Sequence, residues 1–159
     1  MTPLFANQRE TNLASTVALV EAALADLGHP APGSRTSDPD ALHAWQLPVG
    51  SSLTRVTVVQ RADFTHIRVC ATVMVATAPV DRAALHAHLL EQNRSLCGAA
   101  FAASGDQVLI VAERSTLDLD RSEVLDLIGR ITAYADQYDD ELVAAFGGAL
   151  WAAAGSHGT

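Results

Sequence analysis

Residues 53–75 read LTRVTVVQRADFTHIRVCATVMV, and this stretch decides the fold class. Its first part, residues 53–61, alternates between apolar and polar side chains, which is typical of a strand with one packed and one wetter face. Ala62 and Asp63 interrupt the run, and a second strand is predicted from Phe64 to Val75. Two strands joined by so short a turn pair as an antiparallel hairpin. The length of the second strand favours a central place in the sheet.

The residues before this hairpin predict a helix, a loop and one more strand. Apolar residues at spacings of three and four lie on one stripe of the helix: Leu13, Val17, Val20, Leu24 and Leu27. Gly28 ends it. Residues 29–40 are rich in Pro, Gly, Ser and Asp, which predicts a mobile loop. A strand at residues 42–47 then turns at residues 48–51 into the hairpin.

The residues after the hairpin predict a helix, a second hairpin and a long helix. Asp81 is suited to cap a helix from Arg82 to about Leu96. Strands at residues 97–103 and 107–113 follow, and the second is apolar on both sides, so both of its sides should be covered. A capping-box pattern then opens a long amphipathic helix that runs from Asp120 to Gly147-Gly148.

The predicted order of elements is α-β-β-β-α-β-β-α. Strands and helices do not alternate regularly and the sequence has no internal repeat, which disfavours a parallel Rossmann-like sheet. We expect an α+β fold in which an antiparallel sheet of about five strands is covered by helices. A chain of 159 residues is typical of one domain. We place that domain at residues 1–148 and a C-terminal tail at residues 149–159.

Composition and charge restrict the possible partners. The formal net charge of −8 disfavours direct nucleic-acid binding, because phosphates would be repelled. No segment approaches the roughly 18 apolar residues of a membrane span, and residues 1–10 lack a signal-peptide pattern. We therefore expect a cytoplasmic protein with no membrane partner. Cys70 and Cys97 belong to no CxxC or Cys/His cluster, and we expect them to be reduced.

The sequence has no pattern that indicates catalysis, a cofactor or a metal. It lacks the glycine-rich phosphate turns GxxxxGK[ST] and GxGxxG and the nucleophile turn GxSxG. His86 and His88 sit about 200° apart around a helix and cannot share one ion. We predict no enzyme, no cofactor and no metal. One alternative stays open, a small-ligand sensor or an unrecognised enzyme with a pocket between sheet and helices that uses His66, Arg68 or Cys70.

Residues 89–148 carry a resemblance to a known family. The matching features are a Leu-Leu-x-x-Asn helix end, a small-residue strand with a central Phe, a Gly-containing hairpin, a Leu-Asp-Leu-Asp entry and an Ala-Asp-x-Tyr-Asp-x-x-Leu run. In this chain they are Leu89, Leu90 and Asn93; Phe101; Gly105; Leu117 to Asp120; and Ala135, Asp136, Tyr138, Asp139 and Leu142. This segment resembles the second half of YbjN-like proteins and of class I type III secretion chaperones.

The resemblance implies the same α-β-β-β-α-β-β-α domain. It also implies a homodimer without cofactor or catalysis, which binds stretches of client protein on its outer surface. The order of elements extends the resemblance to the residues before Leu89. Nothing in the sequence indicates a secretion context, so a secretion role does not follow from the fold.

We predict two contact surfaces. Apolar side chains of the first helix and the first strands would bind the client: Val17, Leu24, Trp45, Val56 and Val58. The second helix has more apolar breadth than one core requires, because Leu89 and Leu90 point to neighbouring surfaces. It would form the dimer interface through His86, Leu89, Leu90 and Asn93.

The distribution of charge bears on the client. Residues 118–141 contain eight carboxylates and two arginines, so this stretch is strongly acidic. A basic client would complement it, and a nucleic-acid-binding protein is one candidate class. A solvated helix face without a partner is the alternative explanation of the same charges.

Overall fold

The computed structural model describes residues 4–77 and 79–154 of the chain. An antiparallel six-stranded sheet with the order β1-β2-β3-β4-β6-β5 lies at its centre. The strands are β1 (Arg35–Thr36), β2 (His43–Val49), β3 (Ser52–Arg61), β4 (Phe64–Val75), β5 (Ala100–Ser104) and β6 (Gln107–Ser115). The helices are α1 (Leu4–Asp26), α2 (Ala31–Ser34), α3 (Arg82–Asn93), α4 (Arg121–Phe146) and α5 (Trp151–Ala154). The predicted α+β class, the antiparallel sheet and the order of the main elements are confirmed.

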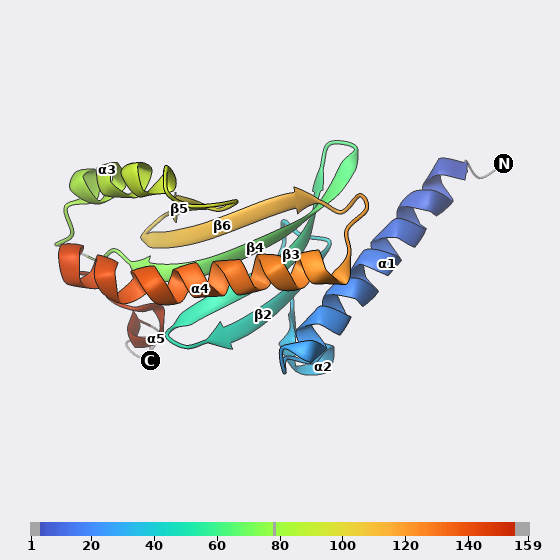
Figure 1. The fold of residues 1–159 in the computed structure, drawn as a ribbon, viewed down its shortest axis with the longest axis horizontal. Coiled ribbons are helices and arrows are strands. Elements are labelled where there is room, and N and C mark those ends of the chain that lie inside the picture. Colours follow the sequence, from blue (N-terminus) through green and yellow to red (C-terminus); the bar gives the residue numbers. More distant parts are fainter. Residues whose placement is uncertain (1–3, 78, 155–159) are drawn as a thin grey trace.

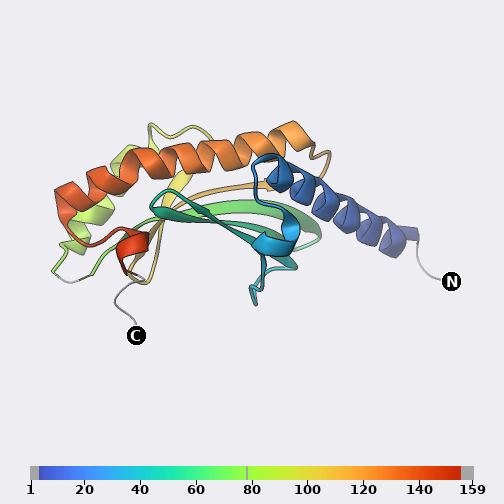
Figure 2. The same ribbon diagram turned by 90° about the horizontal axis from the view of Figure 1, so that it is seen from below.

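The long helix α4 lies along one face of the sheet, as Figures 1 and 2 show. Its apolar stripe is buried at regular helical spacing: Val124, Ile128, Ile131, Ala135, Tyr138 and Leu142. The strands bury every second residue in the same core: Ile67, Val69 and Ala71 on β4, and Val108, Ile110 and Ala112 on β6. The side of the sheet that faces α4 is therefore the core of the fold.

Both ends of α4 are fixed by local interactions. At the start, the Asp120 carboxylate accepts from the backbone N–H of Glu123, while the Glu123 carboxylate accepts from the N–H of Asp120. A hydrogen bond from the Ser122 hydroxyl, together with the one from the Glu123 N–H, holds the pKa of Asp120 below its usual value. At the other end Gly147 and Gly148 have φ angles of 78° and 85°. They end the helix where the sequence predicted.

The helix α1 packs beside α4 and closes the core over β2. Trp45 on β2 is fully buried, and its Nε1 donates to Glu21 Oε1 of α1 at 3.4 Å. The same carboxylate accepts from Arg35, whose guanidinium lies 5.8 Å from the centre of the Trp45 ring. An ion pair between Arg121 and Asp26 joins the start of α4 to the end of α1. The N-terminal half of α1 projects beyond the sheet (Figure 1).

Several segments differ from the sequence-based expectation. The stretch predicted as a mobile loop contains α2 and β1, because the Ser34 hydroxyl donates to the carbonyls of His29 and Pro30 and β1 pairs with β2. The two residues of β1 make the sheet six-stranded where about five strands were expected. The helix α3 ends at Asn93, short of Leu96.

The predicted tail also begins inside the fold. Ala149 and Val75 exchange backbone hydrogen bonds of 2.8 and 3.0 Å, and the N–H of Ala152 donates to the Ser51 carbonyl. Residues 155–159 of the predicted tail lie outside the described residues. The domain boundary at residue 148 stays a prediction.

The double-glycine end of α4 provides a matched test of this packing. A Cβ atom on Gly148 would lie 2.6 Å from the Val75 carbonyl oxygen, whereas one on Gly147 would meet no atom within 4 Å. Gly147→Ala should lower the free energy of unfolding by about 1–3 kcal/mol through backbone strain alone. Gly148→Ala should lower it further, because the strand contact must also open. Chemical denaturation of both variants checks this order, and equal losses would contradict the close approach of residue 148 to β4.

Candidate functional site

A groove with a volume of about 910 Å³ lies at one end of the sheet. Three walls form it: α1, the β3–β4 turn, and the loop between β6 and α4, which lie at the same end of the fold in Figure 1. Its lining residues are Thr11, Asn12, Leu13, Ser15, Leu42, Gln60, Asp63, Phe64, Thr65, Ser115, Thr116, Leu117 and Asp118. We call it the end groove.

Exposed apolar side chains concentrate at the end groove. Among the described residues, five large apolar side chains are exposed, and three of them line this groove: Leu42, Phe64 and Leu117. Phe64 and Leu117 each leave 60% of their surface exposed. Apolar side chains gathered in one hollow are typical of a surface that another molecule covers.

Two threonine hydroxyls meet in the lining of the end groove. The Thr65 and Thr116 hydroxyls lie 2.5 Å apart, and the Thr116 hydroxyl and backbone N–H also lie within hydrogen-bond distance of the Thr65 carbonyl. Thr116 is buried, and this contact ties β4 to the loop between β6 and α4. The lining of the groove therefore combines fixed polar contacts with exposed apolar side chains.

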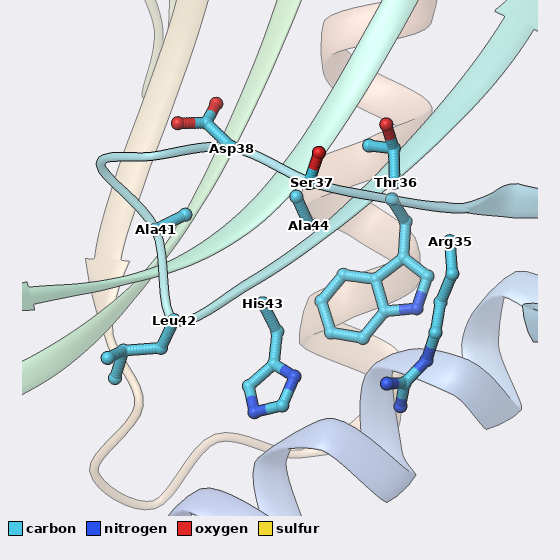
Figure 3. Close-up of a pocket in the computed structure, with 9 residues that line it drawn as sticks. Arg35, Thr36, Ser37, Asp38, Ala41, Leu42, His43 and Ala44 are labelled. Carbon is cyan, nitrogen blue, oxygen red and sulfur yellow. The ribbon is translucent and has the colours of Figure 1, made fainter.

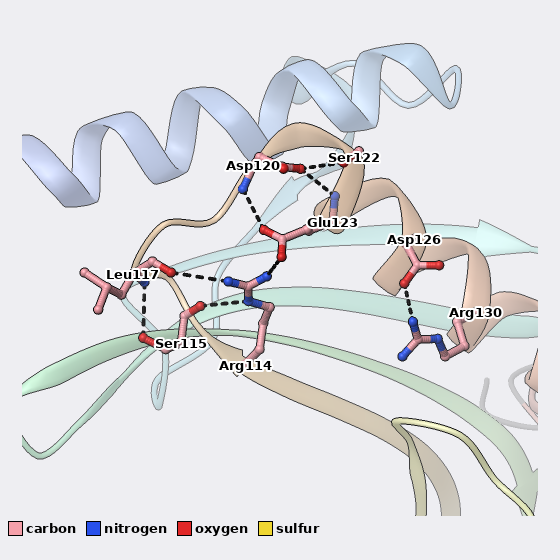
Figure 4. Close-up of polar contacts among 8 residues, drawn as sticks. All are labelled: Arg114, Ser115, Leu117, Asp120, Ser122, Glu123, Asp126 and Arg130. Atoms are coloured by element: carbon pink, nitrogen blue, oxygen red, sulfur yellow. Dashed lines mark hydrogen bonds and ion pairs between the residues drawn. The ribbon is translucent and has the colours of Figure 1, made fainter.

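The loop wall of the end groove is held by Arg114 (Figure 4). Its guanidinium donates to the carbonyls of Ser115 and Leu117 and pairs with the Glu123 carboxylate, which also closes the capping box of α4. The Leu117 N–H in turn donates to the Ser115 hydroxyl at 3.1 Å. Because one arginine links the loop to the start of α4, the position of Leu117 is fixed by the same contacts that begin the helix.

Two strained residues flank the end groove. Ala62 and Asp118 have φ angles of 48° and 53°, and they are the two described non-glycine residues with a positive φ. Ala62 lies in the β3–β4 turn and Asp118 in the loop wall. Left-handed backbone at non-glycine residues is uncommon and concentrates at binding sites. Both turns that shape the groove hold such a residue.

A second hollow, of about 280 Å³, lies at the β1–β2 edge (Figure 3). Polar residues of the connecting segment line much of it, among them Arg35, Ser37, Asp38 and His43. The Trp45 ring borders it, stacked 6.1 Å from His43 between ring centres. Arg35 is already paired with Glu21 and Asp38 with Arg55, so internal ion pairs occupy its charged groups.

The structure places four of the five predicted client-binding residues in the core. Leu24, Trp45, Val56 and Val58 each have no exposed surface, while Val17 is half-buried on α1. The expectation that these four side chains are left exposed is wrong, because α1 and α4 cover that face of the sheet. Contact of these residues with a client stays a prediction, and it would require α1 to move.

The predicted dimer residues divide into two groups. His86 and Leu90 are exposed, and Leu90 leaves 71% of its surface uncovered. Leu89 is only 5% exposed and packs inward. Leu89 and Leu90 therefore point to different surfaces, as predicted from the helical spacing. Asn93 has an internal partner, since its amide accepts from the Phe101 N–H at 2.6 Å and lies 3.5 Å from the Phe101 carbonyl. The dimer interface stays a prediction.

The residues of the alternative ligand pocket lie on the sheet face turned away from α4. His66, Arg68 and Cys70 are half-buried there and line neither of the two hollows. Burial raises the pKa of the Cys70 thiol, against the effect of nearby arginines. A hydrogen bond from Arg61 lowers the pKa of Glu113, which pairs with Arg61 and lies 3.8 Å from Arg68. These contacts form an ion-pair cluster.

Two other features are absent from the described residues. In residues 4–77 and 79–154, no group of three or more His, Cys, Asp or Glu side chains could hold a metal ion. Within the same part of the chain, no helix combines the length and apolarity that a bilayer crossing requires.

The end groove was not predicted from the sequence, because its lining comes from separate segments. One signal could have indicated it. Phe64 directly follows the Ala62-Asp63 turn, and Leu117 lies in a short polar connection, so each is a large apolar residue at a position that usually faces solvent.

Comparison with known proteins identifies relatives of this fold. Residues 14–153 match the model of the TY-Chap1 family, described as T3SS (YopN, CesT) and YbjN peptide-binding chaperone 1. No curated protein sequence gives a significant match.

Among solved structures, a chain of the ExsC–ExsE complex superposes with a TM-score of 0.60 at 13% identity, covering 81% of this chain and 94% of that one. A chain of the HopA1–SchA chaperone–effector complex superposes with a TM-score of 0.57 at 8% identity, covering 82% of this chain and 97% of that one. A chain of the heterodimeric ExoU–SpcU complex from Pseudomonas aeruginosa superposes with a TM-score of 0.51 at 18% identity, covering 79% of this chain and 96% of that one. At these identities the superpositions show a shared fold.

A Leu→Ala substitution should destabilise the protein much more in the core than in the end groove. Leu24→Ala removes a fully buried side chain and should lower the free energy of unfolding by about 2–5 kcal/mol. Leu117→Ala removes a side chain that is 60% exposed and should change it by no more than about 0.5 kcal/mol. Equilibrium denaturation in urea measures both. A large loss from Leu117→Ala would mean that Leu117 is a packing residue and not a free contact surface.

Proposed function

The chain belongs to the TY-Chap1 family of peptide-binding chaperones, and from this premise we propose that it binds an apolar segment of a client protein in the end groove. As a member of a chaperone family it is not an enzyme. The observation that carries the proposal is the gathering of Leu42, Phe64 and Leu117 around one hollow. A client segment would cover these side chains, which the chain itself leaves open.

Burial of apolar surface would supply the affinity. Each side chain that becomes fully buried contributes roughly 1.5–3 kcal/mol, before the costs of ordering the segment. The three exposed side chains of the groove are therefore enough for a specific but reversible complex. The fixed walls add to this, since Arg114 and the Thr65–Thr116 contact hold the groove in shape before the client arrives.

Of the client-binding residues predicted from the sequence, Val17 lies near the end groove. Val17 lies one helical turn from Leu13, which lines the end groove, and it is half-buried. A client longer than the groove could continue along α1 past Val17. It would reach Leu24, Trp45, Val56 and Val58 only if α1 separated from the sheet.

We propose in addition that the protein is a homodimer. Leu90 on α3 is the most exposed large apolar side chain among the described residues. On the sheet face turned away from α4, Leu109 and Val111 of β6 are half-buried, although an apolar strand of this kind is normally covered on both sides. A second copy that contacts α3 and this face would cover both.

The charge of the chain favours a basic client. The net charge of −8 would accelerate encounter with a positively charged protein, while apolar contact in the groove would set how long it stays. A nucleic-acid-binding protein is one class with such a charge. We propose a cytoplasmic location, with which the free thiols Cys70 and Cys97 are compatible.

Affinity capture from the native host tests the groove directly. The double variant Phe64→Ser/Leu117→Ser should recover a specific client at least about tenfold less well than the wild type, because two apolar contacts are lost. The control Leu27→Ser alters an exposed leucine that does not line the groove and should leave recovery unchanged. Quantitative mass spectrometry compares the three. A client recovered equally by the wild type and the double variant would contradict the proposed site.

Light scattering at micromolar concentration tests the dimer. Wild-type protein should have the mass of two chains, and Leu90→Asp should shift it toward one, because a charge would be placed in an apolar contact. Circular dichroism should be unchanged, since this side chain is mostly exposed in the single chain. A monomeric wild type would rule out the proposed homodimer.

A further inference from the structure

We propose that Asp118 selects the client segment by forming an ion pair with a lysine or arginine side chain that lies next to the segment's apolar residues. The inference rests on the proposed function of the end groove. It adds the chemistry by which that groove would distinguish one segment from another.

The position of Asp118 places a carboxylate beside an apolar contact. It follows Leu117 in the loop wall, and both residues line the end groove. Asp118 is exposed, so a partner can reach it without displacing any part of the fold. A cation held there would belong to a residue close to the apolar side chain that packs on Leu117.

Among the described residues that line the end groove, the charged ones are negative. Asp63 and Asp118 are the charged residues among its described lining, which contains no Arg, Lys or His. The arginines next to these segments in sequence pair with other carboxylates: Arg61 with Glu113, Arg114 with Glu123, and Arg121 with Asp26. In the described part of the chain, no hydrogen bond or ion pair to the Asp118 side chain is present. A cation from outside is therefore the complementary partner.

The backbone at Asp118 fixes where the carboxylate sits. Its φ of 53° is left-handed, a conformation that glycine and asparagine adopt at least as readily as aspartate. Hydrogen bonds on both sides hold it, from Arg114 to the Leu117 carbonyl and from the Leu119 N–H to the Thr116 carbonyl. The backbone conformation would therefore tolerate other residues, and the negative charge is the property that asparagine would lack.

A single carboxylate beside an exposed apolar side chain suits an organic cation better than a metal ion. No metal-ligand group of three side chains exists among the described residues. A lysine or arginine side chain can place its apolar stem along Leu117 and its charge on Asp118. An arginine could also make two parallel hydrogen bonds to the carboxylate.

Selection from a library of short random peptides tests the proposal without knowledge of the client. The library is panned on immobilised wild-type protein, on Asp118→Asn, and on Asp136→Asn, which removes an exposed charge from α4 away from the groove. The Asp118→Asn substitution keeps the size of the side chain and the left-handed backbone and removes only the charge. Peptides selected on the wild type and on Asp136→Asn should be enriched in lysine or arginine next to large apolar residues, and those selected on Asp118→Asn should not.

A double-mutant cycle on one selected peptide then measures the contact. Asp118→Asn should weaken binding about three- to tenfold, and Asp136→Asn by less than about twofold. Replacing the basic residue of the peptide with glutamine should weaken binding to the wild type by a similar factor and have little further effect on Asp118→Asn. Fluorescence anisotropy at fixed salt gives all four affinities.

The outcomes separate this inference from the proposed function. Equal basic enrichment on wild type and Asp118→Asn, or additive effects in the cycle, would overturn the role of Asp118 while peptides still depended on Phe64 and Leu117. Selected peptides whose binding survives Phe64→Ser/Leu117→Ser, or a library that yields no binder, would overturn the groove itself and this inference with it.

Discussion

The burial of one stripe of α4 against the sheet is the constraint on which the rest of the structure depends. Because α4 crosses β3, β4 and β6, its apolar residues and those of the strands form a single core. Both ends of the helix then position other parts of the chain. Near the C-terminal end the buried Asp139 accepts from the Ser51 hydroxyl of the β2–β3 turn. At the N-terminal end, the capping box and Arg114 place the loop that forms one wall of the end groove.

The elements that carry a periodic pattern could be predicted from the sequence. The strand Phe64–Val75 has the predicted bounds, and α4 starts and ends at the predicted capping residues, because alternation, helical spacing and caps are local signals. The short elements α2 and β1 could not be predicted. They lack a period of their own, and β1 exists only because β2 lies beside it. Tertiary pairing, which composition does not encode, decides such segments.

The candidate site was less predictable than the fold. An apolar stripe shows which side of α1 is buried, but it does not show how far burial extends, so Leu24 became core while Leu27 stayed 42% exposed. The same limit applies to Val56 and Val58, whose alternation fits a covered face and an open one equally well. The end groove joins residues from α1, the β3–β4 turn and the loop between β6 and α4, together with Leu42 before β2. Only the assembled fold brings Phe64 and Leu117 together, although each stands out as a large apolar residue at a turn.

The chain belongs to a family of peptide-binding chaperones, and we propose that a peptide binds in the end groove. Site-specific photo-cross-linking tests this central claim most directly. A benzophenone amino acid is placed at residue 64 in the groove, at residue 90 on α3 and at residue 136 on α4, and the protein is irradiated in living cells. The account predicts that residue 64 cross-links to a client polypeptide and that residue 136 does not. Client cross-links from residue 136 or 90, with none from residue 64, would contradict it.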